Sequence, residues 1–296
     1  MDTFFNRYLD LGKLTLHYVE GGRPVGEAPT IIFYHGFPSF WYSFHLQMAA
    51  LKDDFHVVAV DGLGANLSSR PSGLDHYKID NLALQLDQLA QHIVGEEAFY
   101  LVGHDWGGVL SSAYAQHYPQ RLKKLAIICA LPFNQLLSML QTNVEQQKRS
   151  KYMYTMRGGM VNLAMTQDNN RQVCDNTCKA LAQFDHFTEE SEKCFRAGLG
   201  TTGAVDAGIN WYRANIPPTD AITDNDFWPS RSARTSVPSL LIWGEADQTF
   251  VPEFIDELPR FVEHLEVLRL PGIGHSPMLE DPDTVNRALR SFLKSE

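Results

Sequence analysis

The chain has 296 residues, 44% of them hydrophobic, and its 35 acidic and 25 basic side chains give a formal net charge of −10. This acidic balance argues against nucleic acid or an anionic membrane as a main partner, because both carry negative charge. The apolar content is sufficient for a large buried core, and no apolar run approaches the roughly 18 residues that a membrane span requires.

The N-terminus lacks a basic start followed by an apolar stretch, so the sequence shows no secretory signal. We therefore expect a cytoplasmic protein with reduced cysteines. Cys174 and Cys178 lie close together with His186 nearby, but their spacing fits no common zinc pattern. We expect these cysteines to be ordinary packing or surface residues and predict no metal site.

Short apolar strands alternate with helical patterns along most of the chain. Strands are expected at residues 14–19, 30–34, 56–60, 99–102, 125–129, 239–243 and 265–270, with helices at 79–93 and 109–117. Continuous apolar runs bounded by turn residues are typical of parallel strands covered on both faces. The alternation therefore predicts a mostly parallel, doubly wound α/β sheet.

This alternation stops between residues 131 and 237, where the pattern is helical and contains no convincing core strand. A helical insertion between two strands predicts a cap over the C-terminal strand ends, where open α/β sheets bind their ligands. We expect a core of residues 1–132 and 234–296 and a cap of residues 133–233. The cap carries several aromatic and methionine side chains, which favour a moderately apolar ligand: Met153, Met156, Phe184, Phe187 and Trp211.

Asp105 lies in the sequence Gly-His-Asp-Trp-Gly-Gly, which follows an expected strand and precedes an expected helix. This is the pattern of a nucleophile elbow, with aspartate in the place of the usual serine. Small neighbours are needed there, because the strand and the helix approach closely around a sharp turn. The alternative is a glycine-rich turn in which Asp105 only caps the helix.

Two later residues favour the nucleophile over the cap. His275 lies in a turn after the last expected strand, and Asp247 follows the strand before it. The chain order of nucleophile, acid and base is the order found in α/β-hydrolases. We therefore predict a triad of Asp105, Asp247 and His275, with Glu245 as the competing acid.

Three separated motifs resemble those of the epoxide hydrolases, within the α/β-hydrolase superfamily. They are His-Gly-Phe-Pro at residues 35–38, the sequence around Asp105, and Asn-Trp-Tyr-Arg at residues 210–213. The resemblance implies the α/β-hydrolase fold, an inserted cap and a cofactor-free reaction that opens a small apolar epoxide to a vicinal diol. It also implies that Tyr212 assists ring opening with Tyr152 as its partner, Tyr154 being the alternative.

One motif departs from the family. Its usual turn after the fourth strand is of the Arg-Gly-Tyr-Gly type, whereas residues 61–69 read Asp-Gly-Leu-Gly-Ala-Asn-Leu-Ser-Ser. This variant is closer to some dehalogenase-like relatives.

An aspartate nucleophile indicates attack on a saturated carbon, which forms an ester that water can cleave. His275 would activate that water, and Asp247 would orient His275. The backbone N–H groups of Phe37 and Trp106 would form the oxyanion hole. The Phe37–Pro38 bond is a candidate cis peptide.

Two histidines near the expected site in the sequence, His35 and His104, are interpreted as structural.

Two other functions remain open. A haloalkane-type dehalogenase could use the same triad, although Phe37 offers a halide no side-chain donor. A non-enzymatic ligand sensor is less favoured, because binding alone does not require an ordered triad. The general frequency of homodimers makes a homodimer the expected assembly.

Overall fold

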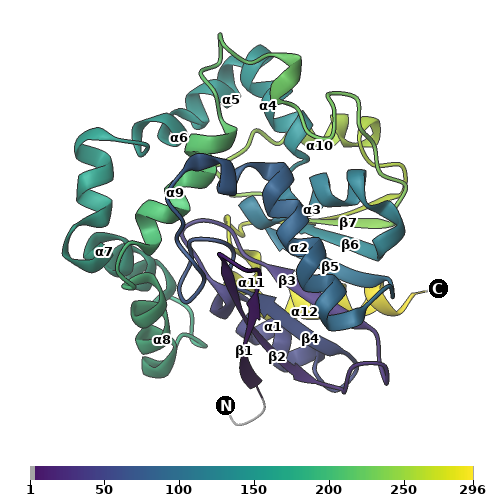
Figure 1. Cartoon of the computed structure of the whole chain (residues 1–296). Coiled ribbons are helices and arrows are strands. Elements are labelled where there is room, and N and C mark those ends of the chain that lie inside the picture. The colour runs from purple at the N-terminus through teal and green to yellow at the C-terminus, as the bar shows by residue number, and fades with distance from the viewer. Residues whose placement is uncertain (1–3, 296) are drawn as a thin grey trace.

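An eight-stranded sheet forms the centre of the computed structural model, which describes residues 4–295 (Figure 1). The strands are β1 (Phe4–Asp10), β2 (Thr15–Gly22), β3 (Thr30–Tyr34), β4 (His56–Val60), β5 (Phe99–His104), β6 (Leu122–Ile128), β7 (Ser239–Gly244) and β8 (Leu265–Leu270). They lie in the order β1-β2-β4-β3-β5-β6-β7-β8. The β1–β2 and β2–β4 pairs are antiparallel, and the other neighbouring pairs are parallel. The predicted mostly parallel sheet is confirmed.

Helices cover both faces of this sheet. One face packs against α2 (Ile79–Val94), α3 (Trp106–His117) and α10 (Phe254–Glu257), and the other against α1 (His45–Leu51), α11 (Pro277–Glu280) and α12 (Pro282–Lys294). Alternate residues of a strand point to opposite faces. In β3, Ile32 and Tyr34 therefore join the first cluster, whereas Ile31 and Phe33 join the second. This two-sided burial explains the continuous apolar runs of the sequence.

A series of helices connects β6 to β7: α4 (Phe133–Thr142), α5 (Val144–Arg149), α6 (Lys151–Thr155), α7 (Gly159–Leu181), α8 (Glu189–Leu199) and α9 (Ala204–Asn215). Helices α6 to α9, in teal and green, lie to one side of the sheet in Figure 1. Helix α9 packs against α2 and against the short helix η2 (Leu74–Tyr77). The insertion is therefore helical, while the exact division into core and cap at residues 133 and 233 stays a prediction.

Further short helices lie in the connections: η1 (Trp41–Phe44), η3 (Pro119–Arg121), η4 (Asp224–Asp226) and η5 (Leu258–Arg260). Within residues 4–295, no helix combines the length and the apolar character needed to cross a lipid bilayer.

Helix α7 is interrupted at residues 167–170, where Asp168, Asn169 and Asn170 adopt left-handed backbone angles. Asparagine and aspartate tolerate this conformation better than most residues do. Beyond the break, Cys174 and Cys178 are buried in an apolar cluster that also contains residues of α8. The packing role predicted for these two cysteines is confirmed.

Candidate active site

Asp105 occupies the sharp turn between β5 and α3, with a φ of 52° and a ψ of −123°. Residues other than glycine rarely adopt a positive φ, and such strain is characteristic of functional sites. A Cβ atom on Gly107 would lie 2.0 Å from the carbonyl oxygen of Tyr34, and one on Gly103 would lie 2.3 Å from that of Gly107. Glycine at both positions lets the strand and the helix approach, as the elbow pattern predicts.

His275 lies between two carboxylates. Its Nδ1 atom is 2.8 Å from Oδ2 of Asp247, and its Nε2 atom is 3.4 Å from Oδ2 of Asp105. Asp247 follows β7 and His275 follows β8, so the ends of neighbouring parallel strands bring the three residues together. Glu245, the competing acid, instead lies 3.9 Å from Arg269. The structure therefore pairs His275 with the acid that the sequence favoured.

The acid is buried and accepts a hydrogen bond from the backbone. The Asp247 side chain is fully buried, and its Oδ1 atom accepts a hydrogen bond of 2.6 Å from the Thr249 N–H group.

Cys129 follows β6 with a φ of 43°. Its sulfur accepts a hydrogen bond from the Gly244 N–H group. Sequence analysis missed this thiol, whose one signal is its place at the end of a buried strand.

The same thiol belongs to the one group of potential metal ligands found among residues 4–295. The Cys129 sulfur and donor atoms of Asp247 and His275 lie within 4.8 Å of one another. Sulfur, nitrogen and oxygen donors together suit Zn²⁺. Here, however, the Nδ1 atom of His275 and the Asp247 carboxylate are hydrogen-bonded to each other, as in a triad.

Asp105 and His275 shift each other's pKa. Burial acts to raise the pKa of Asp105, but the hydrogen bond and charge of His275 outweigh it, so this pKa is lowered. Burial acts to lower the pKa of His275, but its hydrogen bonds to Asp105 and Asp247 raise that pKa to about 10. Both shifts favour an ionised carboxylate beside an imidazolium.

The loop that carries Phe37 supplies a donor to the nucleophile. The Phe37 N–H group donates a hydrogen bond of 2.8 Å to Oδ1 of Asp105. No corresponding bond from the Trp106 N–H group is found in the described part of the chain. The contribution of Trp106 to an oxyanion hole therefore stays a prediction. The Phe37–Pro38 peptide bond is cis, as predicted.

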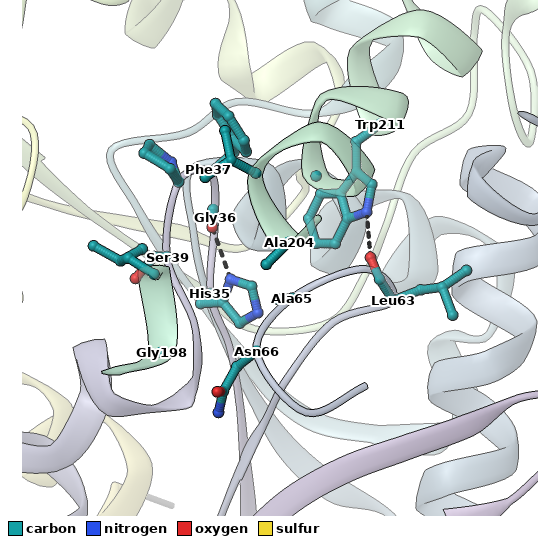
Figure 2. Close-up of a pocket in the computed structure, with 14 residues that line it drawn as sticks. His35, Gly36, Phe37, Ser39, Leu63, Ala65, Asn66, Gly198, Ala204 and Trp211 are labelled. Atoms are coloured by element: carbon teal, nitrogen blue, oxygen red, sulfur yellow. Dashed lines mark hydrogen bonds between the residues drawn. The ribbon is translucent and has the colours of Figure 1, made fainter. Parts of the chain in front are cut away.

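His35 fastens this loop. Its Nδ1 atom donates to the carbonyl oxygen of Gly36 at 2.7 Å, and its Nε2 atom accepts from the Gly62 N–H group at 2.9 Å. Burial lowers the pKa of His35. A neutral imidazole can donate at one nitrogen and accept at the other. Figure 2 shows the first of these bonds, and both agree with the structural role expected for His35.

His104 is hydrogen-bonded to the backbone of the base, His275. Its Nε2 atom lies 2.7 Å from the backbone oxygen of His275, and burial together with repulsion from His275 lowers the pKa of His104 to about 4. A neutral ring that donates to this oxygen is a structural element, as the sequence analysis expected.

Two tyrosines of the inserted helices, Tyr152 and Tyr212, pack against each other. The rings of Tyr152 and Tyr212 lie edge to face, with centroids 6.2 Å apart. Burial raises the pKa of both phenols, and the negative charge of Asp105 raises them further. Tyr154 points elsewhere and donates a hydrogen bond to the carbonyl oxygen of Pro217. Of the two α6 tyrosines, the structure therefore places Tyr152 beside Tyr212.

Aromatic contacts fix the position of Tyr212. Its ring lies edge to face against Phe37 and Trp106, with centroid distances of 5.5 Å and 5.0 Å. The neighbouring Trp211 donates its indole N–H to the carbonyl oxygen of Leu63 at 2.8 Å. Two adjacent residues of α9 thus contact the loop that carries Phe37 and the loop after β4.

Comparisons with known proteins agree with this geometry. The family model described as alpha/beta hydrolase fold matches residues 29–282. Epoxide hydrolase 1 of Caenorhabditis elegans is 27% identical over 97% of this chain and 70% of its own length. AB hydrolase superfamily protein YfhM of Bacillus subtilis is 28% identical over 100% of both chains.

Among solved structures, that of the Bacillus megaterium epoxide hydrolase with an inhibitor has a TM-score of 0.86 and 29% identity. The match covers 98% of this chain and 100% of that one. The resemblance to epoxide hydrolases that the motifs indicated is confirmed. The chain belongs to the α/β-hydrolase fold family.

Proposed function

We propose that the chain is an epoxide hydrolase, which opens a small apolar epoxide to a vicinal diol without a cofactor. The observation that supports this proposal is the contact between Tyr152 and Tyr212, since the Tyr212 ring also packs against Trp106, which follows Asp105, and against Phe37, whose N–H group bonds to Asp105. An epoxide oxygen leaves as a basic alkoxide and needs a proton donor, whereas a halide does not. The epoxide hydrolases among the similar proteins support the same reaction.

In the first step, an Asp105 carboxylate oxygen attacks one ring carbon and the bond from that carbon to the epoxide oxygen breaks. The electron pair of this bond goes to the epoxide oxygen, which takes a proton from a tyrosine. The product is an alkyl ester of Asp105 with a free hydroxyl group. The lowered pKa of Asp105 keeps the nucleophile ionised at neutral pH.

In the second step, water cleaves this ester. Esterification removes the negative charge of Asp105, so the pKa of His275 falls and the imidazolium gives up its proton, which restores the tyrosine. The neutral ring can then accept a proton from water as the water attacks the ester. Asp247 then stabilises the imidazolium that forms. Negative charge develops on the carbonyl oxygen of the ester, which accepts a hydrogen bond from the Phe37 N–H group. Losing such a donor raises the activation barrier by about 3–4 kcal/mol. Collapse breaks the ester bond, the departing alkoxide takes the proton of the new Asp105 carboxyl group to give the diol, and the site returns to a carboxylate beside an imidazolium.

The test traps the ester. A His275→Gln variant keeps the nucleophile but lacks the base, so it should accumulate the intermediate. It is incubated with a mixture of epoxides and short haloalkanes and then examined by intact and peptide mass spectrometry. We expect a gain of one whole epoxide mass on the peptide that contains Asp105. An Asp105→Ala, His275→Gln double variant is the matched control and should gain nothing.

Other outcomes would change the assignment. A gain equal to a haloalkane less the hydrogen halide would make the protein a dehalogenase. The absence of any adduct, with the protein folded, would contradict the aspartyl-ester mechanism for these substrates and strengthen the ligand-sensor alternative.

A further inference from the structure

Residues 271–276 connect β8 to α11, and we call them the base loop because they include His275. The Gly274 N–H group donates a hydrogen bond of 2.7 Å to Oε2 of Glu280. The Ser276 N–H group donates one of 2.8 Å to Oε1 of the same side chain. One carboxylate therefore binds the backbone on both sides of the base.

The base loop is also packed closely against its surroundings. A Cβ atom on Gly274 would lie 2.9 Å from Oε1 of Glu280, and one on Gly244 would lie 2.0 Å from the carbonyl oxygen of Gly274. The backbone oxygen of His275 accepts the hydrogen bond from His104 described above. Because Gly244 is the last residue of β7, these contacts hold the base loop against the strand end after which the acid follows.

The helix that carries Glu280 is fixed from two directions. The side-chain amide of Gln47, in α1, donates a hydrogen bond of 2.9 Å to the backbone oxygen of Met278. The Nε2 atom of His186, in the connection between α7 and α8, donates one of 2.5 Å to the backbone oxygen of Leu279. Glu280 therefore extends from a support that both the sheet domain and the inserted helices hold in place.

The position of the imidazole ring matters in one half of the proposed reaction. Ester formation uses the Asp105 carboxylate and a tyrosine, whereas ester hydrolysis needs the Nε2 atom of His275 to take a proton from water. The Nδ1 atom of this ring lies 2.8 Å from Oδ2 of Asp247, and Nε2 lies 3.4 Å from Oδ2 of Asp105. Because the histidine side chain is short, a shift of the base loop would carry the ring away from both groups.

We propose that Glu280 is a positioning residue for ester hydrolysis, which it supports by binding the N–H groups on both sides of His275. This assignment rests on the proposed function and adds a residue that acts in its second half-reaction. A catalytic group displaced by about 1 Å can cost roughly 10²-fold in rate. Ester formation does not use the base, so the loss should be confined to hydrolysis.

The first test measures both half-reactions with styrene oxide by rapid-quench mass spectrometry. Glu280→Ala removes both acceptors, so ester hydrolysis should fall about 10²-fold while ester formation stays within about threefold of wild type. Glu280→Gln keeps one acceptor oxygen but turns an NH₂ group towards the other N–H group, so hydrolysis should fall about tenfold. Both variants should therefore accumulate the ester during turnover.

Asp281→Ala is the matched control. Asp281 is the next residue, but its side chain accepts a hydrogen bond from the Thr284 N–H group at the start of α12. Its loss removes a helix cap and lowers stability without touching the base loop. The ratio of the two half-reaction rates should stay within about twofold of wild type.

The second test needs no turnover. The pKa of His275 is measured by NMR on protein labelled with ¹³C at the histidine Cε1 atoms, and the signal that is absent from His275→Gln identifies it. Hydrogen bonds to the two carboxylates raise this pKa to about 10, so a displaced ring should titrate nearer to 6.5. Glu280→Asp keeps the negative charge but is too short to reach both N–H groups. The pKa of His275 should therefore fall in Glu280→Asp as well as in Glu280→Ala.

These outcomes separate the two proposals. Unchanged ester hydrolysis in folded Glu280→Ala, or an equal fall in both half-reactions, would overturn the positioning role. A pKa of His275 that falls in Glu280→Ala but not in Glu280→Asp would also overturn it, because charge alone would then explain the effect. If wild type forms no ester with any epoxide but the pKa of His275 falls in both variants, the proposed function fails and Glu280 still positions the imidazole. If Glu280→Ala does not fold, Glu280→Gln and Glu280→Asp decide the same questions.

Discussion

The Nε2 atom of His275 lies 3.4 Å from Oδ2 of Asp105, and this contact links the protonation of the base to the charge of the nucleophile. While Asp105 is ionised, His275 holds its proton. Once the carboxylate is esterified, this hold is released. A single contact thus determines in which half of the proposed reaction the imidazole is a base.

The pair should stabilise the fold most at mildly acidic pH. The raised pKa of His275 contributes stability that is complete below its ordinary value of 6.5 and is lost as pH rises towards about 10. The lowered pKa of Asp105 contributes stability that is complete above its ordinary value of 3.8 and is lost as pH falls below it. Urea unfolding of wild type and His275→Gln should therefore differ most between about pH 4 and 6.5. A difference that instead grows up to pH 9 would contradict this charge assignment.

Removing either phenol of the Tyr152–Tyr212 pair should slow ring opening. We expect Tyr212→Phe and Tyr152→Phe each to lower the rate of ester formation by about 10²-fold, the lower range for a general acid. Tyr154→Phe is the control and should stay close to wild type, because its hydroxyl bonds to Pro217. Rapid-quench mass spectrometry in the His275→Gln background measures this step alone. An equal loss in all three variants would argue for a packing role.

Asp247 and Glu245, the two candidate acids of the triad, should respond differently to substitution. Asp247→Asn removes the negative partner of the imidazolium, so we expect ester hydrolysis to fall by about 10³–10⁴-fold and the ester to accumulate. Glu245→Gln changes a group that faces Arg269 and should keep nearly full activity. Single-turnover rates of the two half-reactions distinguish these variants. Loss of activity in Glu245→Gln alone would reverse the assignment.

His35 should affect both stability and rate. His35→Ala leaves the Gly36 carbonyl and the Gly62 N–H group without their partner, which costs about 1–3 kcal/mol of unfolding free energy for a buried group. It also loosens the loop that presents the Phe37 N–H group, so kcat should fall more than KM rises. Replacement of the exposed His92 by alanine is the control. A normal kcat with reduced stability would restrict His35 to folding.

The sequence was sufficient for the sheet and for the triad pattern because both depend on local rules. Burial on two faces imposes continuous apolar strands, and the turn at Asp105 demands glycine on either side. Strand β1 was missed because it is an edge strand, with Phe5 and Tyr8 more than half exposed. Backbone hydrogen bonds to β2 hold this strand, and such bonds do not require the apolar side chains from which a strand is predicted in a sequence.

Other features depend on packing between distant segments. Tyr152 and Tyr154 belong to the same short helix, and only the docking of α6 beside α9 decides which phenol meets Tyr212. Cys129 is likewise an ordinary strand-end residue until β7 and β8 bring Asp247 and His275 beside it. The local sequence does not show which distant side chains come into contact when the chain folds.

The loop after β4 joins two parts of the site that act in different halves of the proposed reaction. The Gly62 N–H group donates a hydrogen bond to His35, which anchors the loop that carries Phe37, while the next residue, Leu63, accepts a hydrogen bond from the indole N–H of Trp211, the neighbour of Tyr212. A swing of α9 away from the sheet must break that indole bond and release one anchor of the loop. Tyr212, the proposed ring-opening acid, and the Phe37 N–H group, the proposed donor to the ester oxygen, are thus connected through the same loop. A displacement of α9 alone would therefore impair both half-reactions of the proposed mechanism while leaving the triad in place, because none of its three residues belongs to that helix.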